Sequence, residues 1–74
     1  IGYDLPDGVR VIFTIYDCVG REVITLLDEP KTAGSRSIQW NATNSKGEPV
    51  SVGMYIYSIQ AGEFRQTKKM VLLK

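Results

Sequence analysis

The fold of this chain is decided by the stretch GMYIYSIQAG at residues 53–62 and the stretch EFRQTKKMVLLK at residues 63–74. Aromatic and β-branched residues fill the first stretch. The second changes from polar and basic residues to four consecutive apolar ones before Lys74. Gly62 and Glu63 suit a two-residue hairpin with glycine in its first central position. The two stretches therefore predict antiparallel strands, and the returning strand would tie down a chain end that otherwise frays.

Alternating apolar residues predict further strands upstream. Every second residue from Val9 to Ile15 is apolar, which is typical of a strand with one buried face, and Ile38 and Trp40 follow the same pattern. Turn residues separate these segments at Pro6-Asp7-Gly8, Asp17-Cys18-Val19-Gly20, Ala33-Gly34 and Lys46-Gly47. No apolar stripe recurs at helical spacing, so we expect no helix.

These patterns predict an all-β fold, a small immunoglobulin-like or fibronectin III-like antiparallel β-sandwich of about seven strands. The strands are expected near residues 1–5, 9–17, 21–28, 34–41, 53–61 and 64–73, and the pattern allows a short one near 49–51. The predicted core consists of Phe13, Ile15, Trp40, Tyr55 and Ile59, with Trp40 packed between the two sheets.

Length and composition narrow the class of protein. The 74 residues predict a single domain, 1–74, with a thin core, because a domain of this size buries only about 60% of its unfolded surface. The first residue is Ile1 and not an initiator methionine, so we expect a fragment cut from a larger protein or a processed product. No apolar run is long enough to span a membrane, and no signal peptide is present.

Charge is unevenly distributed along the chain. The net charge is +1, but the last ten residues contain four basic residues and no acid, whereas the preceding 64 carry a net charge of −3. A solvated edge strand kept soluble by lysines is the favoured interpretation, and an electrostatic docking site is the alternative. The overall charge is too low for nucleic acid to be an expected partner.

Residue types exclude several kinds of catalysis. The chain has no histidine, so a Ser-His-Asp or Cys-His arrangement cannot form. Asp28 and Glu29 are neighbours on a predicted strand and point to opposite faces, so they cannot share a proton. Cys18 is alone in the chain, and we expect an ordinary, partly buried thiol beside Asp17. A Ser-Lys dyad stays open on residue types alone, but the chain has no strained, Gly-framed serine, so we predict no enzyme and no cofactor.

Two segments suggest ligands without requiring them. Asn41-Ala42-Thr43 matches a glycosylation acceptor, and residues 41–48 offer oxygens to calcium, but the spacing fails the calcium-loop pattern. A loop stabilised by Asn side chains that bond their own backbone is favoured, and we predict no metal site. Tyr55 and Tyr57 share one face of a strand, where an aromatic ladder in the core is favoured over a carbohydrate-binding platform.

A family resemblance rests on a series of short motifs that follow one another along the chain. They are Ile1-Gly2-Tyr3-Asp4-Leu5-Pro6, the segment Val11–Val23, Ala33-Gly34, Trp40-Asn41, Gly53-Met54-Tyr55 and Lys69-Met70-Val71-Leu72-Leu73-Lys74. The set resembles the immunoglobulin-like family shared by the type A C-terminal sorting domain of the type IX secretion system and the Ig-like domain of the flagellar hook-capping protein. The terminal motif favours the sorting domain. The family more often has Asp after the tryptophan, and the Asn-Pro-rich segment that usually precedes the sorting domain is absent.

The resemblance implies that residues 1–74 are a C-terminal domain excised from a larger secreted protein. It also implies a sorting signal that directs this cargo protein across the bacterial outer membrane. Its expected partners are the outer-membrane secretion translocon and an upstream cargo domain, and its expected location is secreted or at the cell surface, via the periplasm. The residues of the expected recognition motif are Gly53, Tyr55, Lys68, Lys69 and Lys74; Lys68 is included because it belongs to the same basic strand.

Two other functions stay open at this point. One is an Ig-like structural or assembly module, either hook-cap-like or a spacer beside a catalytic domain, and the other is a carbohydrate-binding accessory domain. Exposed edge strands would also allow pairing with another copy of the chain.

Overall fold

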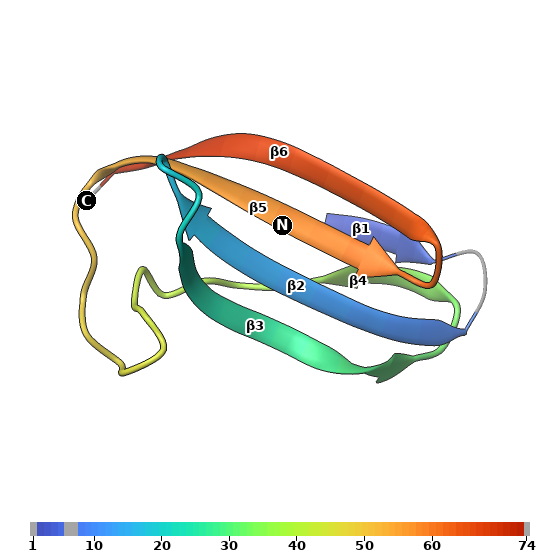
Figure 1. Cartoon of the computed structure of the whole chain (residues 1–74). Coiled ribbons are helices and arrows are strands. Elements are labelled where there is room, and N and C mark those ends of the chain that lie inside the picture. Colours follow the sequence, from blue (N-terminus) through green and yellow to red (C-terminus); the bar gives the residue numbers. More distant parts are fainter. Residues whose placement is uncertain (1, 6–7, 74) are drawn as a thin grey trace.

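The computed structural model describes residues 2–5 and 8–73, which form six strands and no helix (Figure 1). The strands are β1 (Gly2–Leu5), β2 (Val9–Asp17), β3 (Glu22–Lys31), β4 (Gly34–Ser37), β5 (Gly53–Ala61) and β6 (Phe64–Leu72). Strands β3-β2-β5-β6 form an antiparallel four-stranded sheet, and β1 and β4 pair in a second, two-stranded sheet. The prediction of an all-β, Ig-like antiparallel sandwich is confirmed.

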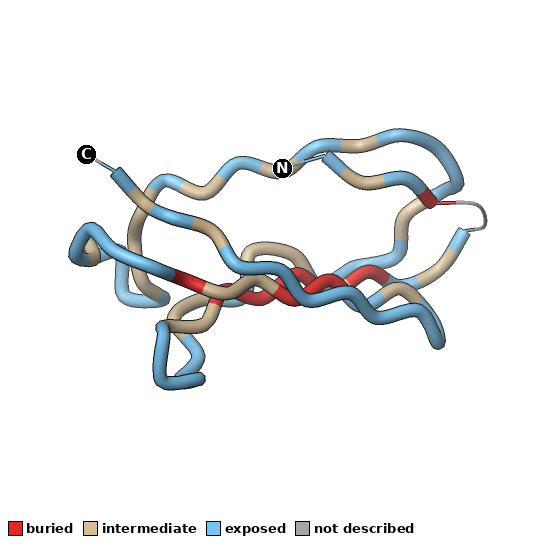
Figure 2. Tube along the Cα trace, turned by 90° about the horizontal axis from the view of Figure 1, so that it is seen from above, coloured by how far each residue is buried: buried red, intermediate tan, exposed pale blue. Residues whose placement is uncertain are grey.

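The core lies between the two sheets and is built mainly from β2 and β5 (Figure 2). Val11, Phe13 and Ile15 have no exposed surface, because alternate residues of β2 point to the same face. Tyr55 and Ile59 of β5 are 8% and 5% exposed. Burying each such side chain stabilises the fold by about 1.5–3 kcal/mol, so the two central strands hold the sheet together.

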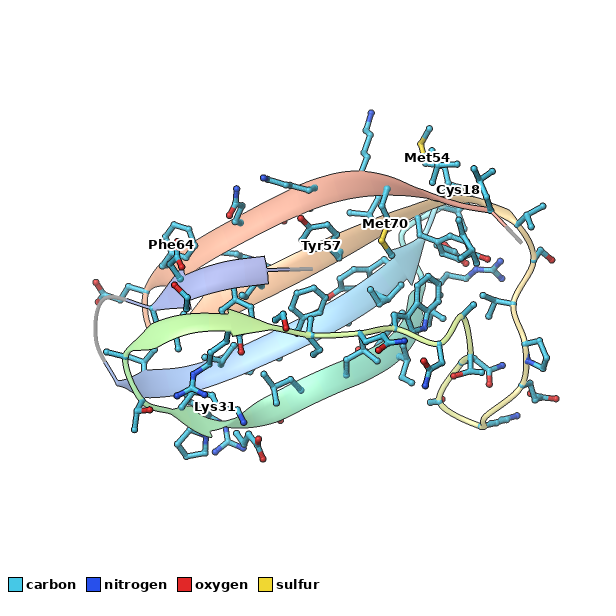
Figure 3. The ribbon with its side chains drawn as sticks, turned by 180° about the vertical axis from the view of Figure 1, so that it is seen from behind. Cys18, Lys31, Met54, Tyr57, Phe64 and Met70 are labelled. Carbon is cyan, nitrogen blue, oxygen red and sulfur yellow. The ribbon has the colours of Figure 1, made fainter. Side chains whose placement is uncertain are left out.

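The aromatic residues form the ladder that the sequence favoured. The rings of Phe13 and Tyr57 stack across β2 and β5, with centroids 5.2 Å apart and planes inclined by 10°. Trp40 meets Tyr55 edge-on, with centroids 5.2 Å apart. Figure 3 shows Tyr57 pointing into the space between the sheets. Tyr55 is buried and cannot serve as an exposed platform for a sugar ring.

The turns at Asp17–Gly20 and at Gly62–Glu63 follow the predicted residues, and the predicted turn at Pro6-Asp7 lies outside the described residues. The amide of Gly20 donates to the carbonyl of Asp17 over 3.0 Å, and Gly20 has a φ of 89°, which glycine adopts without steric cost. Gly62 has a φ of 61° in the two-residue turn that joins β5 to β6. The two hairpins around the central strands are therefore set by local sequence.

Several strand limits differ from the predicted ones. β3 continues to Lys31 rather than 28, because β2 pairs with it as far as Val9↔Lys31. β4 ends at Ser37 rather than 41. The short strand near 49–51 is reduced in the described residues to a single bridge between Thr43 and Pro49.

Trp40 and Cys18 also differ from expectation. Trp40 is only half-buried and lies outside the strands, because the chain turns at Ala42, whose φ is 59°, and the indole Nε1 donates to the carbonyl of Thr43 over 2.8 Å. Trp40 therefore anchors a loop against the core instead of filling the core. Cys18 is exposed, not partly buried, because it sits at the tip of the turn from β2 to β3.

Candidate functional site

The predicted recognition residues gather on the β5–β6 pair. Gly53 lies opposite Leu72, Tyr55 opposite Met70, Ile56 opposite Lys69 and Tyr57 opposite Lys68, in a register without shifts. Lys74 lies outside the described residues. The structure therefore places the described members of the motif on two neighbouring strands, although their surroundings differ.

Gly53 and Tyr55 support the fold where β5 begins. Gly53 has a φ of 145°, a conformation that residues with a side chain rarely adopt, so glycine is needed where β5 begins. The Tyr55 hydroxyl donates to the carbonyl of Ser51 over 2.7 Å, and its ring contacts Trp40. Both residues build the start of β5, and neither presents a side chain to a partner.

Lys68 and Lys69 are exposed on β6, the strand at one edge of the four-stranded sheet. Because residues of a strand alternate between faces, Lys68 lies on the inner face with Tyr57 and Lys69 on the outer face with Ile56. Arg65 lies on the same face as Lys69, opposite Gln60. None of the three cations has an ion-pair partner within residues 2–5 and 8–73.

Arg65 was not among the predicted site residues. The spacing of four residues between Arg65 and Lys69, an even number, was the available signal, since it puts both side chains on one face of a strand. β5, the neighbour of β6, has no charged residue at all. The positive charge of β6 is therefore not offset by its neighbouring strand.

Two of the carboxylates of β3, those of Asp28 and Glu29, are already paired. Arg10 Nε lies 2.8 Å from Asp28 Oδ1, and Lys31 Nζ lies 2.6 Å from Glu29 Oε1. The register places Asp28 on the outer face with Ile12, and Glu29 on the inner face with Val11, which confirms that the two acids point apart. They cannot act as a catalytic pair.

Asp17 holds the turn between β2 and β3. Its carboxylate accepts hydrogen bonds from the amides of Val19 (3.0 Å) and Arg21 (2.9 Å) and from Arg21 Nε (3.0 Å). These bonds, above all the one from the Arg21 amide, lower the pKa of Asp17 below its ordinary value, against a smaller opposing effect of desolvation. A carboxylate with this many donors is a structural group.

The loop at residues 44–48 satisfies its own polar groups. Asn44 Oδ1 accepts from the amides of Lys46 (2.9 Å) and Glu48 (3.0 Å), and Asn44 Nδ2 donates to Glu48 Oε1 over 3.2 Å. The favoured prediction of a loop held by an Asn side chain is confirmed. Residues 44–46 and 48–51 line a shallow polar cleft of about 490 Å³ with Asp17, but no cluster of three metal-ligating side chains occurs among the described residues.

Two packed antiparallel sheets of this kind define an Ig-like domain. The family model of the FlgD Ig-like domain matches residues 1–63, and the chain belongs to this family. This is the Ig-like family shared with the flagellar hook-capping protein. No curated protein and no solved structure matches the chain. β6 lies beyond the matched residues, and no helix in the described part of the chain could cross a membrane.

Proposed function

We propose that this chain is a non-catalytic assembly module that fixes the polypeptide carrying it in a larger extracellular structure. The observation that carries the proposal is the match to the FlgD Ig-like family over residues 1–63. The fold is suited to this role, because the buried residues of β2 and β5 hold the sandwich together and so keep its outer strands in fixed positions. Three of its carboxylates, those of Asp17, Asp28 and Glu29, are engaged in a turn and in ion pairs, which suits a structural role.

The test replaces residues 1–74 of the parent polypeptide with an unrelated Ig-like sandwich of similar size. We expect the parent to be produced and folded but no longer to enter its assembly, which size-exclusion chromatography and native mass spectrometry would show as a lower mass. A parent that carries Lys46→Glu, a change in an exposed loop, is the control and should assemble normally. An assembly of unchanged mass after the replacement would overturn the proposal.

A second candidate function is the sorting signal of the type IX secretion system. It is favoured by β6, which carries most of the terminal motif of that family, is exposed along most of its length, and lies beyond the residues matched by the FlgD Ig-like model. In this proposal the domain reaches the cell surface or the medium via the periplasm, and the translocon recognises the basic strand.

A secretion assay distinguishes the two functions. A signal peptide and a reporter are fused upstream of residues 1–74 and expressed in a type IX-competent bacterium and in a translocon-deficient strain. Reporter outside the cell in the competent strain alone would support the sorting signal, and changing Lys68, Lys69 and Lys74 together to Ala should then abolish export. Reporter retained in the periplasm of both strains, with the domain folded, would eliminate the sorting signal.

A further inference from the structure

β6 offers a complete strand edge to another polypeptide. It is nine residues long and pairs with β5 in nine consecutive positions without a bulge. Within the described residues no strand pairs with its other side. Such an edge presents a row of backbone donors and acceptors that an added strand can use. β6 also contains no proline that would interrupt this row.

The charged side chains of β6 are positive on both faces of the sheet. Arg65 and Lys69 lie on the outer face and Lys68 on the inner face, and all three are exposed. β6 contains no acidic residue, and its neighbour β5 contains no charged one. An added strand with acidic side chains on both faces would therefore meet opposite charge directly across the new pairing, where cross-strand pairs contribute about 0.2–1 kcal/mol each.

Apolar side chains flank the charged centre of β6. Phe64 is 59% exposed at its first position, and Val71 is 65% exposed near its last, beside Met54 of β5, which is 49% exposed. Figure 3 shows Phe64 and Met54 at opposite ends of the β5–β6 pair. A partner that covered both ends would span about eight residues, or about 25 Å of strand.

A second copy of this chain is a poor occupant of the edge. Two β6 strands paired with each other would set cations opposite or diagonal to cations, which is destabilising. The other edge strand, β3, carries Pro30, which has no backbone N–H, and its acids Asp28 and Glu29 are already paired with Arg10 and Lys31. The occupant that fits is an acidic segment of a different protein.

We propose that β6 is a docking strand for an acidic, extended segment of another protein, which adds to the four-stranded sheet as its fifth strand. The proposal rests on the assembly function and names the surface and the class of partner that this function would use. Its recognition chemistry is backbone pairing along β6, with carboxylates facing Lys68 and Lys69 and apolar side chains at the two ends.

The test uses residues 1–74 and a ten-residue blocked peptide in which Val and Glu alternate, except for two adjacent Glu residues at the centre. Titration followed by amide NMR should shift signals of β6, and added salt should weaken the binding. Lys69→Glu should weaken binding about tenfold or more, because a like charge then faces the peptide. Lys46→Glu makes the same charge change in a loop and should leave the affinity unchanged.

A second peptide separates strand addition from simple charge attraction. It has the same charges but carries proline at two central Val positions, which prevents strand pairing, and it should not bind measurably. Equal binding of the proline peptide, an equal loss of affinity in Lys46→Glu, or shifts away from β6 would each overturn the docking strand. β6 signals that shift with protein concentration alone would identify a second copy as the occupant and also overturn it.

The peptide experiment and the replacement experiment fail independently. The first measures the isolated chain, and the second measures incorporation of the parent polypeptide into its assembly. Loss of assembly on replacement together with absent peptide binding would keep the assembly function and eliminate this docking strand. Intact peptide binding with an unchanged assembly would eliminate the assembly function, and with it the use that the docking strand is proposed to serve.

Discussion

The two edges of the four-stranded sheet, β3 and β6, are nearly equal in length but differ in how they end the sheet. β3 pairs with β2 through two register shifts, carries Pro30, and has two of its carboxylates held in ion pairs. β6 pairs with β5 without a shift and carries three cations with no ion-pair partner in the described residues.

The difference shows that two charged edges need not be equivalent. Bulges and proline close an edge, because they remove regular hydrogen-bonding positions, whereas lysines leave the backbone intact and only select which partner can approach. β3, with its two register shifts and Pro30, therefore offers an added strand fewer regular hydrogen-bonding positions than β6 does. β6 is closed to positively charged strands, including its own copy, and stays open to acidic ones. Figure 2 shows β6 exposed along most of its length, in contrast to the buried residues of β2 and β5.

The largest expected effect on the free energy of unfolding comes from the buried core of the two central strands, which lie between the edge strands. Phe13→Ala should lower the free energy of unfolding by about 3–5 kcal/mol, because Phe13 is fully buried and its removal leaves a cavity. Phe64→Ala makes the same change on β6, where the side chain is 59% exposed, and should cost much less. Urea unfolding followed by tryptophan fluorescence measures both; equal losses would contradict a core confined to the central strands.

A second change should allow β3 to pair with a strand of another copy. Pro30→Val restores an N–H to β3, which then offers a more acidic edge to the basic β6 of another copy. We expect the apparent mass to rise with protein concentration in analytical ultracentrifugation, and to fall again in high salt. Pro49→Val, in the loop before β5, is the control. A Pro30→Val variant that stays monomeric at all concentrations would show that proline is not what closes β3.

A smaller effect is expected at the turns that precede the two edges. Asp17→Ala removes the acceptor that holds the turn before β3, so it should lower the unfolding temperature at neutral pH. The folded pKa of Asp17 is lowered, so its contribution is present above the unfolded pKa and is lost as pH falls through the folded value. The difference from wild type should therefore shrink below about pH 4.

The turn before β6 supplies the control for that change. Glu63→Ala alters an exposed acid in the Gly62–Glu63 turn, for which no hydrogen bond or ion pair is formed within the described residues. Thermal unfolding at several pH values should show no comparable effect at neutral pH. A loss from Asp17→Ala that stays constant from pH 7 to about pH 2 would contradict the role of the ionised carboxylate.

The smallest expected effect concerns the charges themselves. Arg10→Ala breaks the ion pair with Asp28, whose two side chains are 60% and 50% exposed, and should cost about 0.2–1 kcal/mol. Arg65→Ala on β6 should leave the free energy of unfolding unchanged. Chemical unfolding at low and high salt measures both, and only the Arg10 effect should fall with salt. A larger loss from Arg65→Ala would mean that β6 uses its cations for stability.

Much of the fold followed from local sequence. The alternation from Val9 to Ile15 identified the buried face of β2, and the Gly62–Glu63 turn identified the β5–β6 hairpin, because period-two burial and turn geometry are local properties. Trp40 was misplaced for the opposite reason. Its alternation with Ser37 and Gln39 resembles a strand, but the chain turns at Ala42 and the indole bonds to Thr43.

The sequence predicted which segment of the chain carries the candidate site, but not which of its side chains are exposed. The basic composition of residues 65–69 was visible in the sequence, as was the approach of Gly53 and Tyr55 to the same hairpin. Their separation into fold-building and exposed residues was not visible. It depends on the contact of the Tyr55 ring with Trp40, which comes from another segment of the chain, and on the hydrogen bond from Tyr55 to Ser51, four residues before it.

By itself, the sequence determined the all-β class, the central strands and the hairpin turns of this protein, because these depend on the alternation of neighbouring residues and on the conformations of glycine. Only the tertiary structure decided which strands lie at the edges, which carboxylates are paired and which cations stay free. Strand order joins residues far apart in the chain, as β2 joins β5, and it is selected by the packing of the whole core.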